Sequence, residues 1–134
     1  KNRYMPEVIY TEWAGHAVEI AARKAKEEVF AVVAIGGDGT INEIARSLVH
    51  TKTALGIIPC GSGNGLARHL QIPMEAKKAI DIINEGLIDI IDYGKINDVP
   101  FFCTCGVGFD ALSVCNFPRP AEGGHFIYLG ENPA

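Results

Sequence analysis

The fold is decided by residues Val29 to Glu43, which read VFAVVAIGGDGTINE. Residues 29–35 are a short apolar run, rich in β-branched side chains and ended by glycine. Such a run is typical of a strand that is buried on both faces of a parallel sheet. Residues 41–50 then carry apolar side chains at helical spacing, which predicts an amphipathic helix. Strand, glycine loop and helix in this order indicate an α/β unit.

The same order recurs on both sides of this stretch. Residues 54–58 form a second apolar run, and a second glycine loop follows at 60–65. Further predicted elements are a strand at 8–10 and helices at 14–28, 66–70 and 73–84, the last one ended by Gly86. On the first of these helices Glu19, Arg23, Lys24 and Glu27 are expected to face outward. The alternation predicts a doubly wound parallel sheet between two helical layers, a three-layer α/β/α domain.

The pattern changes after Ile88. A strand is predicted up to Ile96, a turn at residues 97–100 and a strand at 101–107, which is the order of a hairpin. We therefore expect two domains: an α/β domain at residues 1–91 and the start of a truncated β-rich domain at 92–134. The last twenty residues have no clear period and are expected to be loop or part of that second domain.

Composition excludes several classes of function. Hydrophobic residues make up 48% of the 134 residues, charged residues 21%, and the net charge is −4. An acidic chain without basic runs is a poor nucleic-acid binder. No apolar run reaches the roughly 20 residues that cross a bilayer, so any membrane contact is expected to be peripheral. The cysteines match no zinc pattern and are expected to be reduced and buried, while Trp13 is expected in a core or interface.

The first glycine loop is the strongest candidate site. Gly36, Gly37 and Gly39 lie between a predicted strand and helix, where free backbone N–H groups and the helix N-terminus favour a phosphate. Asp38 suits this site if Mg²⁺ bridges it to phosphates, or if it accepts a proton from an attacking hydroxyl. A structural alternative is that Thr40 and Glu43 form a capping box that starts the helix.

The second glycine loop follows the next predicted strand. Ser62 and Asn64 offer short polar groups among glycines, which could bond phosphate or adenine. The alternative is an ordinary strand-to-helix turn with Asn64 as N-cap. Because the carboxyl ends of neighbouring parallel strands share one edge of a sheet, we expect the two loops to meet there.

Three stretches together, GGDGTINE (36–43), PCGSGNGLA (59–67) and GVGFDA (106–111), resemble the diacylglycerol kinase catalytic-domain family, which includes sphingosine and ceramide kinases. The resemblance covers the chain up to about Leu112, and it implies an ATP site between an α/β domain and a β-sandwich domain. Asp110 would lie at the start of that sandwich, or is simply a turn residue. The residues expected to bind ATP are Thr11, Gly36, Gly37, Asp38, Gly39, Thr40, Ile41, Asn42, Glu43, Gly61, Ser62, Gly63 and Asn64.

The chain also departs from the family. The family's first strand is expected to be missing before Lys1, most of the sandwich is expected to be missing after Leu112, and Gly65 stands where many members have Asp. The missing first strand would leave an unpaired sheet edge, and pairing with a second copy is one expected consequence.

The resemblance predicts an ATP- and Mg²⁺-dependent lipid kinase, cytoplasmic and peripheral to a membrane. It would phosphorylate the hydroxyl of a diacylglycerol-like or sphingoid lipid, and Asp38 is the expected catalytic residue. An NAD kinase shares GGDGT, but the GSGN loop argues against it. A nucleotide-binding module without catalysis is the third hypothesis.

Overall fold

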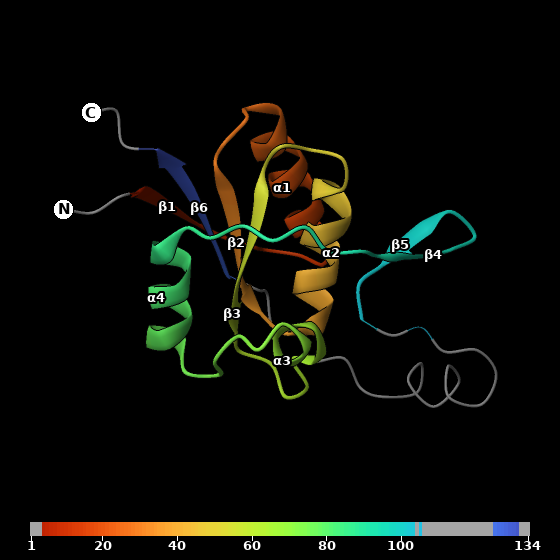
Figure 1. The fold of residues 1–134 in the computed structure, drawn as a ribbon. Coiled ribbons are helices and arrows are strands. Elements are labelled where there is room, and N and C mark those ends of the chain that lie inside the picture. The colour runs from red at the N-terminus through yellow and green to blue at the C-terminus, as the bar shows by residue number, and fades with distance from the viewer. Residues whose placement is uncertain (1–3, 104, 106–124, 132–134) are drawn as a thin grey trace.

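The computed structural model describes residues 4–103, 105 and 125–131 (Figure 1). Four strands form one sheet in the order β1-β6-β2-β3, and two further strands form a separate hairpin. The strands of the main sheet are β1 (Tyr4–Tyr10), β2 (Ala31–Gly36), β3 (Ala54–Pro59) and β6 (His125–Glu131).

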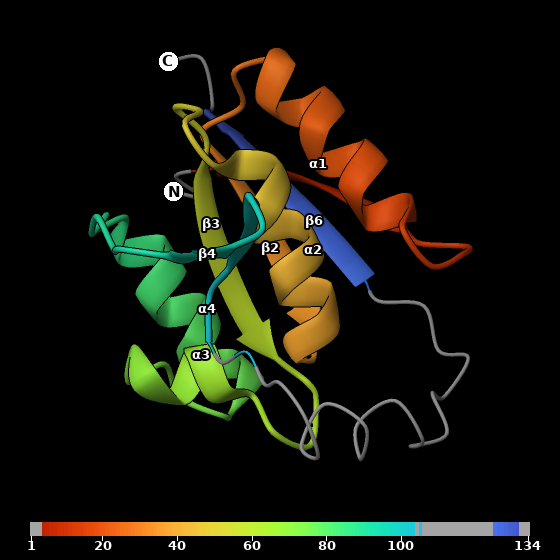
Figure 2. The same cartoon turned by 90° about the vertical axis from the view of Figure 1, so that its right-hand side faces the viewer.

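Helices cover both faces of the main sheet. Helices α1 and α2 lie together on one face and α4 lies on the other, while α3 lies beyond the ends of β2 and β3 (Figures 1 and 2). This arrangement confirms the predicted α/β class with helices on both faces. The helices are α1 (His16–Lys26), α2 (Asp38–Leu48), α3 (Gly65–His69) and α4 (Ala76–Glu85).

Strand β2 is buried on both faces, as its apolar run predicts. Val32 and Ala34 belong to the core under α1 and α2. Ala31 and Val33 point the other way and pack in the core that contains Ala79 of α4. The period of two along a strand sends successive side chains to opposite faces, so a strand with helices on both faces has no polar position.

Strands β2 and β3 are parallel, with register from Ala31↔Ala54 to Gly36↔Pro59. Strand β6 pairs antiparallel with both β1 and β2, so β1 and β2 run in the same direction on either side of it. The predicted parallel sheet is therefore a mixed sheet, in which, of the described strands, only β2 and β3 are paired in parallel. The expectation that the last twenty residues are loop or second domain is therefore wrong for His125–Glu131. Seven residues of continuous pairing with β1 place this strand inside the α/β sheet, between β1 and β2. The sequence pattern predicted no strand at this position.

The predicted hairpin is confirmed, but its bounds are not: the strands are shorter, and Val99 and Pro100, which were predicted to lie in the turn, belong to the second strand. Strand β4 (Gly94–Ile96) pairs antiparallel with β5 (Val99–Phe101). The two residues between them, Asn97 and Asp98, have φ of 46° and 61°, as a two-residue hairpin turn requires. The continuation of this hairpin as a β-sandwich stays a prediction, and GVGFDA (106–111) with Asp110 lies outside the described residues.

Two predicted helix starts are wrong by three residues. Helix α2 begins at Asp38 with Gly37 as N-cap, and no side chain makes a capping hydrogen bond there. The capping box of Thr40 and Glu43 is therefore not formed, because Thr40 already lies inside the first turn. Helix α4 begins at Ala76 instead of Pro73, and ends as predicted at Gly86, which adopts φ 68°.

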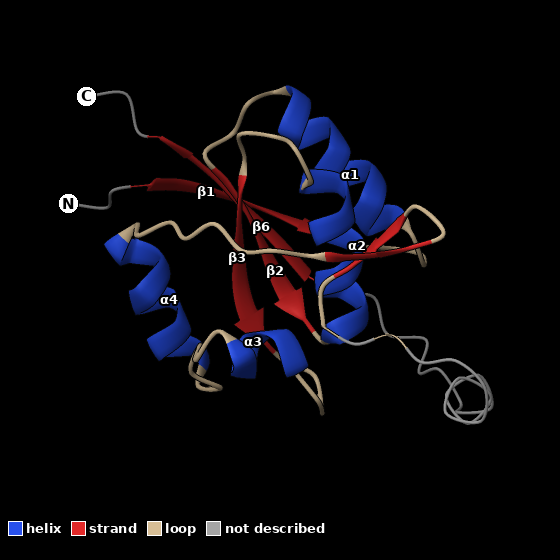
Figure 3. Ribbon diagram, turned by 45° about the vertical axis from the view of Figure 1, so that its right-hand side comes forward, coloured by secondary structure: helices blue, strands red, loops and turns tan. Residues whose placement is uncertain are grey.

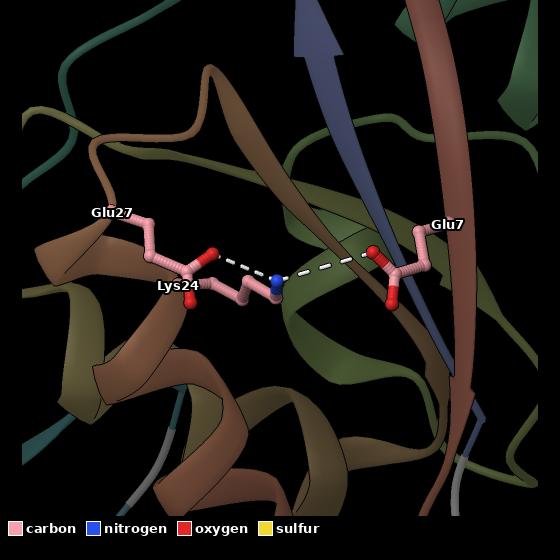
Figure 4. A network of polar contacts seen from close by, with 3 residues as sticks. All are labelled: Glu7, Lys24 and Glu27. Atoms are coloured by element: carbon pink, nitrogen blue, oxygen red, sulfur yellow. Dashed lines mark hydrogen bonds and ion pairs between the residues drawn. The ribbon is translucent and has the colours of Figure 1, made fainter.

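Lys24 is another correction, since it does not face outward but is 8% exposed. Its Nζ lies 2.8 Å from Glu27 Oε2 and 4.0 Å from Glu7 Oε2 (Figure 4). Glu7 is on β1 and Lys24 on α1, so the contact joins the helix to the strand that precedes it. The aliphatic stem is buried while the two carboxylates remain about half exposed.

We expect Lys24→Ala to lower the free energy of unfolding by about 1–2 kcal/mol. It removes buried stem packing together with two ion pairs that are each worth at most about 1 kcal/mol. Lys24→Met keeps most of the stem and should cost less than about 1 kcal/mol. Urea denaturation of the two variants measures the difference. An equal loss in both would mean that the charge, and not the packing, holds α1 against β1.

Candidate functional site

The two glycine loops begin side by side at the edge of the sheet. Strands β2 and β3 end at Gly36 and Pro59, which are partners in the parallel register. The backbone N–H of Cys60 donates to the carbonyl oxygen of Gly36 at 2.9 Å, which extends the pairing into the loops. Both loops then lead into helices, α2 and α3, at the carboxyl end of the sheet (Figure 3). The predicted meeting of the loops is confirmed.

Glycine is required where the loops touch. A Cβ atom at Gly61 would lie 2.5 Å from Gly37 Cα, and a Cβ at Gly37 would lie 3.2 Å from Gly61 Cα. Gly37 has φ −93° and ψ −172°, an extended conformation that any residue adopts. Glycine is favoured at Gly37 because two backbones approach closely. A left-handed backbone conformation, the other common reason for glycine, is not adopted there.

Asp38 connects the two loops. Its Oδ1 accepts a hydrogen bond of 2.7 Å from the backbone N–H of Gly65, at the start of α3. Its Oδ2 faces the second loop, where a Cβ at Gly63 would lie 2.7 Å away. Because Asp38 is also the first residue of α2, its negative charge sits favourably at a helix N-terminus. The carboxylate is exposed and lies where both loops meet.

Asn64 shapes the second loop from within. It is 5% exposed and adopts φ 55°. Its Oδ1 accepts from the N–H of Gly61 at 2.9 Å, and its Nδ2 donates to the carbonyl of Gly61 at 2.5 Å. Asn64 is the N-cap residue of α3 in position, but its side chain folds back on its own loop instead of capping the helix. Both amide atoms therefore serve the loop, while Ser62 stays exposed.

The remaining predicted residues are spread along the same edge. Thr40, Ile41, Asn42 and Glu43 lie in the first turns of α2; Ile41 is buried in the core, while Gly39 and Asp38 are exposed. Thr11 follows β1, which is separated from β2 by β6. Tyr10 and Ile35 share the partner His125, so Thr11 lies level with Gly36 but about 10 Å away, two strand spacings of about 4.8 Å each. Trp13, two residues on, is 51% exposed and stacks on His16. A core role for Trp13 is therefore wrong, and the interface role stays a prediction.

Sequence reasoning missed two residues at the loops, Arg68 and Cys103. Arg68 donates from Nε to the carbonyl of Gly63 at 2.8 Å. Cys103 lies beside Gly65, since a Cβ at that glycine would be 2.6 Å from its Sγ. Cys60, Cys103 and Cys105 are free, as expected, but exposed, which corrects the prediction of buried thiols. The position of Arg68, one turn after the loop, could have indicated its contact with Gly63. Nothing in the sequence spacing indicated that Cys103 lies beside Gly65.

Neither a metal cluster nor a membrane helix is found in the described part of the chain. Across residues 4–103, 105 and 125–131 no group of three or more His, Cys, Asp or Glu side chains could hold a metal ion. Among the same residues, none of the helices is long and apolar enough to span a bilayer.

Comparison with known proteins identifies the family. The family described as diacylglycerol kinase catalytic domain matches residues 1–96. A diacylglycerol kinase of Staphylococcus saprophyticus is 39% identical over 84% of this chain and 37% of its own length. One from Bacillus subtilis strain 168 is 40% identical over 73% of this chain and 33% of its own.

A solved structure has the same fold. The crystal structure of a diacylglycerol kinase from Bacillus anthracis str. Sterne has a TM-score of 0.64 and 29% identity, and covers 68% of this chain and 35% of that one. The chain belongs to the diacylglycerol kinase catalytic-domain family. It spans between about a third and two fifths of the length of these relatives.

The close approach of the loops predicts the effect of two glycine substitutions on stability. Gly61→Ala should lower the free energy of unfolding by about 1–3 kcal/mol, the usual cost of overpacking, because its Cβ would meet backbone. Gly39→Ala lies inside α2, where its Cβ would meet no described atom within 4 Å apart from chain neighbours and nearby backbone of the helix, and should raise stability by about 0.5–1 kcal/mol. Thermal unfolding of both variants tests this. A neutral Gly61→Ala would show that the loops can separate at little cost.

Proposed function

We propose that this chain is the nucleotide-binding part of an ATP-dependent lipid kinase. One observation carries the proposal: in a member of this family, two glycine loops lie in backbone contact at the carboxyl ends of β2 and β3, with the Asp38 carboxylate over both. Ligands of open α/β sheets bind at this edge. The whole activity also depends on the part of the protein beyond this chain.

The loops suit a phosphate chain. Gly36, Gly37 and Gly39 would hold it together with the N-terminus of α2, an eleven-residue helix whose dipole favours negative charge. Gly61, Ser62 and Gly63 would bound the site on the other side. Thr11, level with the loops but farther along the edge, would contact another part of the nucleotide, as the family resemblance implies.

The reaction is transfer of the γ-phosphoryl group of ATP to a lipid hydroxyl. The new bond joins the hydroxyl oxygen to the γ-phosphorus, the bond to the β-phosphate oxygen breaks, and ADP leaves. Asp38 would accept the proton of the hydroxyl or hold a metal ion at the phosphates. Mg²⁺, when bound, would neutralise phosphate charge. One carboxylate oxygen of Asp38 already accepts from Gly65, so the other is the one we assign to this role.

The acceptor lipid is proposed to be a diacylglycerol-like or sphingoid alcohol presented at a membrane surface. The diacylglycerol kinase relatives favour the glycerolipid, and the family match favours a lipid acceptor over NAD. The protein would be cytoplasmic and peripheral to the membrane. The full-length protein with labelled ATP and a panel of diacylglycerol, sphingosine, ceramide and NAD tests the assignment directly. Transfer to NAD, or to none of the four, would contradict it.

We predict that Asp38→Asn in the full-length protein lowers kcat by about a hundredfold or more, the scale of losing a preorganised charge at a reacting centre. Asparagine keeps an Oδ1 that can accept from Gly65, so the melting temperature should change little. Asp38→Ala serves as the comparison, since it removes the loop contact as well and should lower both activity and stability. Near-normal turnover of Asp38→Asn would exclude Asp38 from the chemistry.

Gly39→Ala separates phosphate binding from folding. Outside its chain neighbours and the nearby backbone of α2, no described protein atom lies within 4 Å of the added methyl group, yet a phosphate held at the start of α2 would meet it. Calorimetry should show ATP binding weakened about tenfold or more, equivalent to the loss of about one charge-assisted hydrogen bond. Ser47→Ala, farther along the same helix, is the control. Unchanged ATP affinity in Gly39→Ala would mean that phosphate does not lie at this turn.

A further inference from the structure

Residues 93–103, which we call the hairpin segment, run from the C-terminal end of helix α2 back to the second glycine loop of the candidate site. The segment contains β4 and β5 and lies along helix α2 (Figures 2 and 3). Asp38 is the first residue of this helix, and the segment is attached near its other end. Cys103, the last residue of the segment, returns to the glycine loops beside Gly65.

Two polar contacts attach the segment to α2 and the residues just after it. Arg46 Nε donates to the carbonyl oxygen of Pro100 at 2.7 Å. The hydroxyl of Tyr93 lies 3.0 Å from Nε2 of His50, and their rings meet edge to face at 6.1 Å. The arginine thereby satisfies a backbone acceptor of the hairpin that lies against α2.

Apolar packing continues the attachment toward the loops. The Tyr93 ring contacts the ring of Phe102 with centroids 5.7 Å apart. Phe102 in turn packs against the core that contains Ile41, Ile44 and Leu66. The next residue is Cys103. A Cβ atom placed on Gly65 would lie 2.6 Å from Cys103 Sγ and 4.0 Å from its Cβ, so the thiol occupies the space that a side chain at position 65 would fill.

We propose that Arg46 and Tyr93 are positioning residues for the candidate nucleotide site. They hold the hairpin segment on α2, and through Phe102 they keep Cys103 over Gly65. Gly65 donates its N–H to Asp38, so Cys103 lies against the residue whose hydrogen bond joins the two loops. The segment thereby borders the second glycine loop. The Cys103 side chain lies where a side chain at position 65 would lie, so a larger residue at 65 requires the side chain of residue 103 to move.

A consequence for catalysis rests on the proposed function. Arg46 and Tyr93 touch neither glycine loop in the described structure, so their loss should leave ATP binding nearly intact. Their loss should instead loosen the hairpin segment beside Asp38, where the acceptor hydroxyl must be held. Misplacement of reacting groups by a distant change lowers the rate of the chemical step. The expected signature is a lower kcat with an unchanged KM for ATP.

The first experiment measures the placement of Cys103 without any enzymatic assay. Cβ atoms 4.0 Å apart suit a disulfide, for which the range is about 3.5–4.5 Å. The full-length Gly65→Cys variant, oxidised with a glutathione redox buffer, should form a bond between positions 65 and 103, seen by mass spectrometry of unreduced peptides. Gly63→Cys, whose Cβ would meet only Asp38, is the control and should not link to Cys103. Absence of the 65–103 bond in folded Gly65→Cys would overturn the placement.

The second experiment tests the two positioning residues. Arg46→Ala or Tyr93→Phe, combined with Gly65→Cys, should slow formation of the 65–103 bond by about threefold or more, because local opening separates the pair more often. Arg46→Lys, which can still donate to Pro100, should restore the rate. Arg23→Ala removes an exposed arginine that makes no side-chain hydrogen bond to the described residues, and should have no effect. Equal linking rates in all of these variants would overturn the proposal.

Steady-state kinetics of the single variants, without the added cysteine, complete the test. Arg46→Ala and Tyr93→Phe should lower kcat about fivefold or more with an unchanged KM for ATP, while Arg46→Lys stays near the parent protein. A rise in the KM for ATP without loss of kcat would contradict the positioning role. If the parent protein transfers no phosphate to lipid, the proposed function fails, and the linking rates still decide whether Arg46 and Tyr93 place Cys103.

Discussion

The backbone contact between Gly37 and Gly61 is the constraint on which the rest of the site depends. Each strand of a parallel pair ends at the same edge, but their loops normally diverge to start their helices. Here a Cβ on Gly61 would lie 2.5 Å from Gly37 Cα, so the loops stay this close only while position 61 lacks a side chain. A Cβ on Gly37 would make a tight contact of 3.2 Å with Gly61 Cα. The hydrogen bond from Cys60 N–H to the Gly36 carbonyl joins the two loops where they leave the strands. The hydrogen bond from Gly65 N–H to Asp38 joins them again where they enter the helices.

Helix α2 contacts the second glycine loop, the larger core and the hairpin segment along its length. Its first residue, Asp38, touches the second loop, and its buried face, Ile41, Ile44 and Leu48, forms the centre of the larger core. Its last turn holds Arg46, which binds the hairpin segment. A helix that is packed along its length thereby joins the edge with the glycine loops to the hairpin segment, although Arg46 makes no described contact with either loop.

Much of the site was predictable from local pattern. Strand, glycine loop and helix in succession place 36–43 and 61–64 at the carboxyl edge of a sheet by topology alone, and this prediction held. The role of individual side chains was less predictable. The spacing of Thr40 and Glu43 matches a capping box. The helix nevertheless begins at Asp38, because the carbonyl of the N-cap residue Gly37 already accepts a helical hydrogen bond from Ile41. Asn64 looked like a ligand group, but its amide is used by Gly61.

The sequence by itself determined the class of the fold, the two loops and the family, because apolar period, glycine position and motif are properties of neighbouring residues. The tertiary structure alone decided that β6 lies between β1 and β2, that Lys24 is buried between two carboxylates, and that Cys103 covers Gly65. These contacts join residues far apart in the chain, and no local pattern encodes a distance between them. They arise only when helices and strands pack against a common core, since packing, and not sequence separation, sets which side chains share a space.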